Sequence, residues 1–177
     1  GRLSEVPVST LSVAPPVPSA PAVSALGLRK VFHAGESEIV ALDDVSLTIA
    51  RGTVVALLGP SGSGKSTLLK ALGFVAPADR GEVAFEGRTM VKDGRALADL
   101  AALRRKHLGF VFQKANLTSF LTAGENVALA GELGARPDPK QRARELLGYL
   151  DVGHRAHAYP ETLSGGEQQR VAIARAL

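Results

Sequence analysis

The sequence predicts an α/β protein in which a buried strand leads directly into a glycine-rich loop and a helix. Residues 53–58 (TVVALL) are apolar on both faces of a strand, which is typical of strands inside a parallel sheet. A glycine-rich loop follows, and residues 68–73 continue as a helix, with Pro77 and Gly81 beyond its end. From Thr122 to the last residue the pattern is helical. This order of strands and helices indicates the α/β class.

Two strands joined by a turn precede the glycine-rich loop. Apolar residues alternate or run continuously through residues 26–32 and 39–49, and residues 33–37 (HAGES) form the turn between them. Alternation in the second strand gives it one buried face. Two further short strands, separated by a polar, helix-like insert around residues 96–105, are predicted at residues 81–85 and 108–112.

Three helices are predicted after these strands. Thr122 and Glu125 have the T-x-x-E spacing of a capping box, in which each side chain satisfies an amide at the start of a helix. Residues 137–150 form the second helix, with a stripe of leucines as its apolar face. The third begins near Gly165 and continues to the last residue.

The composition is that of a globular protein with one domain. The chain has 177 residues, of which 45% are hydrophobic and 21% charged. Residues 1–25 are rich in Pro and Ala and are predicted to be a flexible tail, so that the domain covers residues 26–177. No apolar run approaches the roughly 20 residues that span a bilayer. If the protein works at a membrane, a partner must supply the spanning part.

Charge and residue usage exclude several kinds of site. The absence of cysteine excludes disulfides, thiol catalysis and cysteine–metal sites, and the four histidines lack metal-ligand spacing. The net charge is +4, and the densest basic patch is residues 104–106 (RRK). Such a patch could contact nucleic acid, but a solvated helix face is the favoured interpretation.

A phosphate-binding motif lies directly after the apolar run. Residues 59–66 (GPSGSGKS) match G-x-x-x-x-G-K-[ST], in which glycines bring backbone N–H groups close to phosphate oxygens. The following helix directs its positive end at the same anion. We expect Lys65 to reach the β- and γ-phosphates, Ser66 to bind Mg²⁺ and Thr67 to contact the α-phosphate. The predicted binding residues are Gly59, Pro60, Ser61, Gly62, Ser63, Gly64, Lys65, Ser66 and Thr67. Kinases, GTPases, helicases and transport ATPases share this motif, so it does not by itself name the protein.

A second candidate anion site lies near the end of the sequence. Ser164, Gly165 and Gly166 precede or begin the last predicted helix, and Glu167 follows them. A serine hydroxyl, free N–H groups and a positive dipole end together favour an anion there. One chain therefore carries two phosphate sites that are far apart in sequence.

The run LSGGEQQR at residues 163–170, together with the VAIARAL that follows it, resembles the signature of the ABC superfamily of ATPases. The resemblance covers residues 26–177. Residues 36–47 and 120–127 are similar to the lipoprotein-release and macrolide-exporter group, although amino-acid and phosphonate importers share much of the same pattern. It implies a P-loop NTPase core with an antiparallel β subdomain and a helical subdomain that carries the signature. It also implies that the last part of the core is missing from residues 1–177.

The same resemblance implies how the protein works. Two nucleotide-binding domains pair head to tail, and each ATP with its Mg²⁺ lies between the P-loop of one domain and Ser164, Gly165, Gly166 and Glu167 of the other. Gln113 corresponds to a glutamine that approaches Mg²⁺ and the attacking water and senses the membrane partner. Phe32 occupies the place of an aromatic ring that stacks on adenine, with core packing as the competing role. A homodimer docked to a transmembrane permease at the cytoplasmic face of the membrane is expected, without direct nucleic-acid binding.

Hydrolysis is not expected of residues 1–177 alone. In the ABC superfamily the signature helix is followed by a strand that ends in Asp and Glu, where the Asp helps to hold Mg²⁺ and the Glu acts as general base. Residues 1–177 contain no such strand after the signature, so we expect a truncated chain that binds ATP without cutting it. The alternative function is a soluble or regulatory ABC ATPase that acts as a nucleotide switch without moving cargo. The cargo itself would be determined by the permease.

Overall fold

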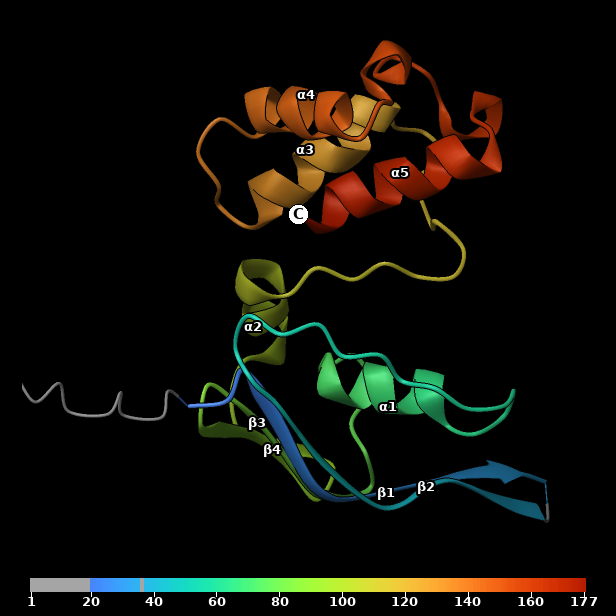
Figure 1. Ribbon diagram of the computed structural model, residues 1–177, viewed down its shortest axis with the longest axis vertical. Helices are drawn as coiled ribbons and strands as arrows, with labels where there is room; N and C mark the ends of the chain where they lie inside the picture. Colours follow the sequence, from blue (N-terminus) through green and yellow to red (C-terminus); the bar gives the residue numbers. More distant parts are fainter. Residues whose placement is uncertain (1–19, 36) are drawn as a thin grey trace, which may run out of the picture.

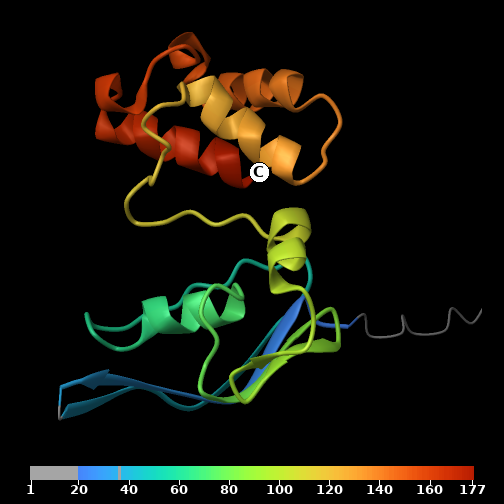
Figure 2. The ribbon, with the colours of Figure 1, turned by 180° about the vertical axis from the view of Figure 1, so that it is seen from behind.

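The computed structural model describes residues 20–35 and 37–177, arranged as a sheet unit and a helical unit (Figure 1). Most of the predicted tail, residues 1–19, lies outside the described residues. Figure 2 shows the same two units from behind, joined by the extended segment between α2 (Leu100–His107) and α3 (Ala123–Leu133).

The sheet unit contains five antiparallel strands in the order β2-β1-β3-β4-β5. Strands β1 (Val23–Ala34) and β2 (Ser37–Ile49) form a long antiparallel hairpin. Their pairing runs from Val23 opposite Ile49 to the turn between the two strands. The shorter strands are β3 (Arg80–Phe85), β4 (Arg88–Lys92) and β5 (Arg95–Ala96). The predicted hairpin strands and the predicted strand at residues 81–85 are confirmed, whereas β4 was not predicted.

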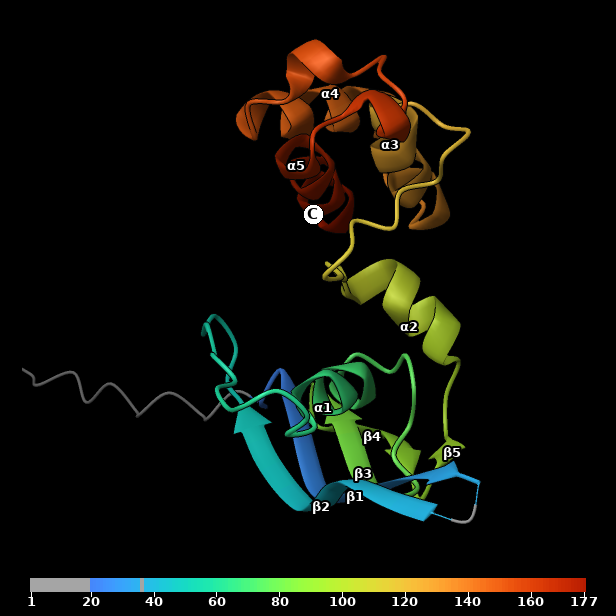
Figure 3. The ribbon, with the colours of Figure 1, turned by 90° about the vertical axis from the view of Figure 1, so that its right-hand side faces the viewer.

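Helix α1 (Lys65–Leu72) covers one face of this sheet, and α2 stands between the sheet and the helical unit (Figure 3). The core of the sheet unit is formed by apolar side chains of the strands, α1 and the segment after it, including Leu28, Leu68, Phe74 and Val83. The Arg104 guanidinium donates to the carbonyl oxygen of Phe74 at 2.6 Å, which attaches α2 to this core.

The helical unit has its own core. Its elements are α3, α4 (Pro139–Tyr149), η1 (Gly153–Arg155), η2 (Pro160–Thr162) and α5 (Gly165–Ala176). Leu147, Val152 and Val171 are fully buried in it. The three predicted helices are therefore confirmed, and Thr122 and Glu125 form the predicted capping box.

Two predicted strands are absent from the structure. Residues 53–58 and 108–112 have no regular secondary structure, and Val54 and Leu58 are 100% and 87% exposed. A strand apolar on both faces is stable only when other strands pair with its edges and helices cover its faces. Within the described part of the chain no strand pairs with either segment, so the prediction of a central parallel strand at residues 53–58 is wrong for this structure. The helix-like insert predicted around residues 96–105 corresponds to α2.

Among the described residues, no helix is long and apolar enough to cross a membrane.

Candidate nucleotide-binding site

The predicted phosphate loop connects residues 53–58 to α1. Gly62 and Gly64 both have a φ of 82°, a backbone conformation that favours glycine. Gly64 is the N-cap of α1 and makes no side-chain cap, so the first amides of the helix are free for an anion. In the described part of the chain, the amides of Gly62, Gly64, Lys65 and Ser66 make no hydrogen bond.

Strand β2 lies directly behind this loop. A Cβ atom on Gly64 would lie 2.2 Å from the carbonyl oxygen of Ala41, far inside van der Waals contact. Any side chain at this position would push the loop off the strand. The sequence therefore needs glycine at position 64 for packing as well as for its backbone conformation.

Lys65 is folded over its own loop. Its ammonium donates to the carbonyl oxygens of Gly59 at 2.8 Å and Pro60 at 2.6 Å, and to the hydroxyl of Ser63 at 3.2 Å. The Lys65 side chain is flexible, and the oxygens of a bound phosphate would replace these three oxygen partners of its ammonium. The geometry thus suits a lysine that turns from its own loop toward a bound anion.

Ser66 and Thr67 follow at the start of α1, and the Ser66 side chain is exposed. No group of three or more acidic or histidine side chains in the described residues could hold a metal ion by itself. A hydroxyl beside a phosphate cradle fits Mg²⁺, which keeps several waters and binds through few protein ligands together with substrate phosphates. Ser66 is the residue here that fits such a shared site.

Phe32 lies on β1 opposite Ile39, at the turn half of the hairpin. Its side chain is 48% exposed and does not belong to the core of the sheet unit. The Lys30 ammonium lies 5.7 Å from the centre of its ring, which leaves the rest of the ring accessible. This placement argues against core packing for Phe32, and its stacking on adenine stays a prediction.

The signature residues begin α5. Ser164 is the N-cap: its hydroxyl accepts from the amide of Glu167 at 3.3 Å, and the Glu167 carboxylate accepts from the amide of Ser164 at 2.7 Å. The amides of Gly165 and Gly166 make no hydrogen bond in the described part of the chain. A Cβ atom on Gly165 would meet no atom within 4 Å, so packing within the chain does not require glycine there. Two free amides on an exposed glycine pair suit the close approach of an outside anion.

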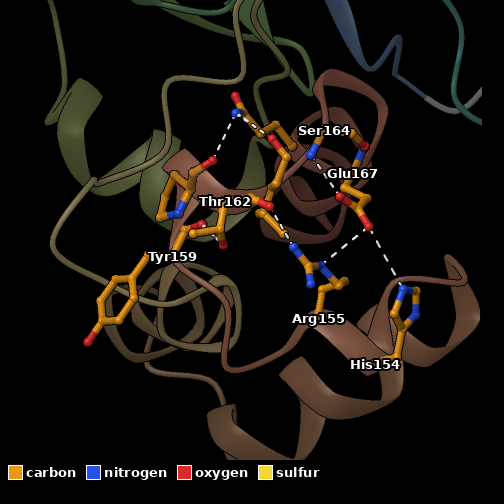
Figure 4. A network of polar contacts seen from close by, with 9 residues as sticks. His154, Arg155, Tyr159, Thr162, Ser164 and Glu167 are labelled. Atoms are coloured by element: carbon orange, nitrogen blue, oxygen red, sulfur yellow. Dashed lines mark hydrogen bonds and ion pairs between the residues drawn. The ribbon is translucent and has the colours of Figure 1, made fainter.

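A polar network surrounds this cap (Figure 4). The Arg155 Nε lies 3.4 Å and the His154 Nε2 lies 3.8 Å from the same carboxylate oxygen of Glu167. Hydrogen bonds from the backbone and hydroxyl of Ser164 hold the pKa of Glu167 below its usual value, and the nearby Arg155 and His154 add to this effect. Glu167 therefore stays ionised at neutral pH.

Gln113 lies on the segment between α2 and α3. It lines a cavity of about 380 Å³ together with Gly165 and Gln168, so the structure brings it to the signature helix. Within the described residues it makes no hydrogen bond to the phosphate loop. Within the described residues no hydrogen bond joins the phosphate loop to the signature. The contact of Gln113 with Mg²⁺ stays a prediction.

Sequence reasoning did not identify Arg155, His154, Lys30 or Asp79 near these sites. The Asp79 carboxylate accepts from the Lys30 ammonium at 2.6 Å and from the amide of Val31 at 2.8 Å. Arg155 and Lys30 each meet an acidic partner many residues away along the chain. Spacing along one helix or strand could not reveal such pairs.

Together, the glycine loop at the start of α1 and the antiparallel sheet behind it define a P-loop nucleotide-binding domain. The chain belongs to the ABC transporter family, because the family model of that description matches residues 42–177. The predicted family and fold class are thereby confirmed. Members of this family are ATPases that bind ATP, typically with Mg²⁺.

Relatives support this assignment. The macrolide export ATP-binding/permease protein MacB of Photorhabdus laumondii is 45% identical over 153 residues, which are 85% of this chain and 23% of MacB. An uncharacterised ABC transporter ATP-binding protein of Thermotoga maritima is 46% identical over 150 residues, which are 84% of this chain and 63% of that protein. The chain spans about a quarter of the length of the macrolide-export relatives.

Solved structures share the fold. The dimeric, post-hydrolysis structure of the ATP-binding cassette MJ0796 bound to ADP and Pi has a TM-score of 0.81 at 40% identity. The similarity covers 88% of this chain and 68% of that one. A second dimeric structure of MJ0796, described as a bacterial ABC transporter cassette, gives the same TM-score at 39% identity.

Proposed function

We propose that this chain is the ATP-binding part of an ABC transporter, and that it couples ATP binding and hydrolysis to the movement of a substrate by a membrane permease. The observation that supports this most is the presence of two separate surfaces with free helix N-terminal amides. One is the phosphate loop before α1 and the other is the signature before α5. Each suits a phosphate group, and within the described residues they make no contact with each other.

Two copies paired head to tail would bring these surfaces together across one ATP. The phosphate loop, with Lys65 and Ser66, would hold the phosphates and Mg²⁺ from one copy. Ser164, Gly165 and Gly166 would close on the γ-phosphate from the other. Phe32 would stack on the adenine, and Gln113 would join the site as the copies close. The dimeric structures of MJ0796 support the pairing of two copies.

The partner in the membrane is proposed from the relatives. Several are export ATP-binding/permease proteins, in which the matching part is fused to a permease. This favours a transport subunit at the cytoplasmic face of the membrane over a soluble nucleotide switch, and it favours export as the direction.

Binding and hydrolysis are separable for residues 1–177. A general base must lie within hydrogen-bond reach of the attacking water. Among the described residues, none of the ion pairs includes Lys65, and no carboxylate is hydrogen-bonded to the phosphate loop. We therefore propose that residues 1–177 bind ATP without hydrolysing it.

Calorimetric titration with Mg-ATP and with inorganic tripolyphosphate tests the site. Lys65→Ala removes the ammonium that compensates phosphate charge, so we expect it to weaken the binding of both ligands by about tenfold or more. Lys70→Ala, on the same helix outside the motif, is the matched control and leaves both affinities unchanged. Equal affinities in wild type and Lys65→Ala would contradict the proposed site. Phosphate release by wild type above that of Lys65→Ala would contradict the proposed lack of hydrolysis.

A further inference from the structure

Glu167 places a negative charge at a surface proposed to receive phosphate. It is the third residue of α5 and directly follows Gly165 and Gly166, in the same first turn as their free amides. The Glu167 carboxylate accepts a hydrogen bond from the amide of Ser164, and its lowered pKa keeps the carboxylate ionised. A bare carboxylate at this distance would repel an incoming γ-phosphate, because two like charges a few ångströms apart interact strongly near a protein surface.

Arg155 and His154 face the oxygen of Glu167 that does not cap the helix. The Ser164 amide occupies Oε2, whereas the Arg155 Nε and the His154 Nε2 approach Oε1 (Figure 4). Glu167 is 18% exposed and Arg155 33%, so water screens this pair less than a pair on the open surface. His154 is 68% exposed and contributes less.

Arg155 is also fixed to the backbone just before the signature. Its Nη2 donates to the carbonyl oxygen of Thr162 at 2.5 Å, while its Nε is buried and makes no hydrogen bond. The contact between Nε and Glu167 is therefore one of charge rather than a formed hydrogen bond. Arg170, one turn further along α5, makes no ion pair with Glu167 within the described residues.

We propose that Arg155 is a positioning residue that neutralises Glu167 and so makes the Ser164–Gly166 surface receptive to the triphosphate bound by a second copy of the chain. This inference rests on the proposed head-to-tail pairing. Arg155 touches neither nucleotide nor Mg²⁺ in this role. It acts through Glu167, whose capping of Ser164 sets the direction of the hydroxyl and of the two glycine amides.

The chain allows a test that separates charge from geometry. Arg155→Met keeps an unbranched side chain that reaches the position of Nε, removes the guanidinium group and leaves the Glu167 charge uncompensated. Glu167→Gln removes that charge while keeping a side chain that can complete a capping box. Pairing is measured by sedimentation velocity in Mg-ATP, and binding at the phosphate loop is measured with tripolyphosphate. Arg142→Met is the matched control, because it removes one positive charge from an ion pair on α4.

We expect Arg155→Met to weaken Mg-ATP-dependent pairing by about tenfold or more and to leave tripolyphosphate affinity unchanged. The double variant Arg155→Met/Glu167→Gln should recover most of the pairing, and Arg142→Met should pair like wild type. The unfolding midpoint of each variant is measured to check that the variant is folded.

Other results overturn the inference in distinguishable ways. If Arg155→Met pairs as well as wild type, Arg155 has no such role. If the double variant stays as weak as Arg155→Met, the Thr162 contact matters and charge compensation does not. If wild type binds tripolyphosphate but does not pair in Mg-ATP, the proposed pairing fails, and this inference fails with it while the phosphate loop stands.

Discussion

Asp79 connects three neighbouring residues of β1 through separate atoms. Its amide donates to the carbonyl oxygen of Arg29 at 2.8 Å, and its carboxylate accepts from the amide of Val31 and the ammonium of Lys30. Lys30 in turn lies over the Phe32 ring. Partial burial raises the pKa of Asp79, but the hydrogen bonds from Lys30 and Val31 and the charges of Lys30 and His33 together lower it below the usual value.

We expect Asp79→Asn to lower the free energy of unfolding by about 1 kcal/mol at pH 7, a figure kept small because the carboxylate is 44% exposed. The folded-state pKa lies below the unfolded one. The stabilising effect of the Asp79 carboxylate is therefore complete above about pH 4 and is lost as the pH falls through the folded-state pKa. Urea unfolding at pH 7 and at pH 3 measures this, and the difference from wild type should shrink at the lower pH. Glu86→Gln, in an exposed pair with Arg51, is the control. A difference between Asp79→Asn and wild type that grows on acidification would contradict this account.

At the scale of elements, two helices of the helical unit begin with the same device. Thr122 caps α3 and Ser164 caps α5, each reciprocated by a glutamate three residues on. Hydrogen bonds from the cap residue's backbone and hydroxyl hold the pKa of both Glu125 and Glu167 below the usual value. The caps are structurally alike, but only the second is followed by two exposed glycines.

We expect Thr122→Ala and Ser164→Ala each to lower the free energy of unfolding by about 1 kcal/mol, as is usual for the loss of an N-cap. Only Ser164→Ala should also weaken pairing in Mg-ATP. Thermal unfolding and sedimentation in Mg-ATP measure the two effects, with Ser119→Ala, at an exposed position before α3, as the neutral control. Equal loss of pairing in Thr122→Ala and Ser164→Ala would show that helix stability, and not the signature hydroxyl, controls pairing.

These elements also show how far the sequence could predict the structure. The capping box at Thr122 and the helix after the phosphate loop depend on residues within a few positions, so their spacing was sufficient. Residues 53–58 were predicted as a buried strand because their pattern indicates what the segment can bury. Whether it pairs depends on strands elsewhere. The Lys30–Asp79 contact spans 49 residues and the neutralisation of Glu167 by Arg155 crosses from η1 to α5, so both depend on the tertiary fold.

At the scale of the whole molecule, two arginines among the described residues attach α5 to the connecting segment and α2 to the sheet unit. The Arg175 guanidinium, near the end of α5, donates to the carbonyl oxygens of Ala115 at 2.8 Å and Asn116 at 2.7 Å, which lie on the segment between the units. Arg104 attaches α2 to the sheet unit. Residues 53–58 lie outside both cores, which leaves apolar side chains of the segment before the phosphate loop in contact with water.

This exposure predicts how the chain behaves in solution. Large exposed apolar side chains bind hydrophobic dyes and promote association. We expect Val54→Ser/Leu58→Ser to reduce both dye fluorescence and self-association in the absence of nucleotide, and to change the free energy of unfolding by no more than about 0.5 kcal/mol. Leu147→Ala, in the core of the helical unit with no exposed surface, should instead cost about 2–5 kcal/mol. If the double variant also lost about 2 kcal/mol or more, residues 53–58 would be buried in solution. In that case residues 53–58 would form in solution the strand that their sequence predicts, paired with a partner.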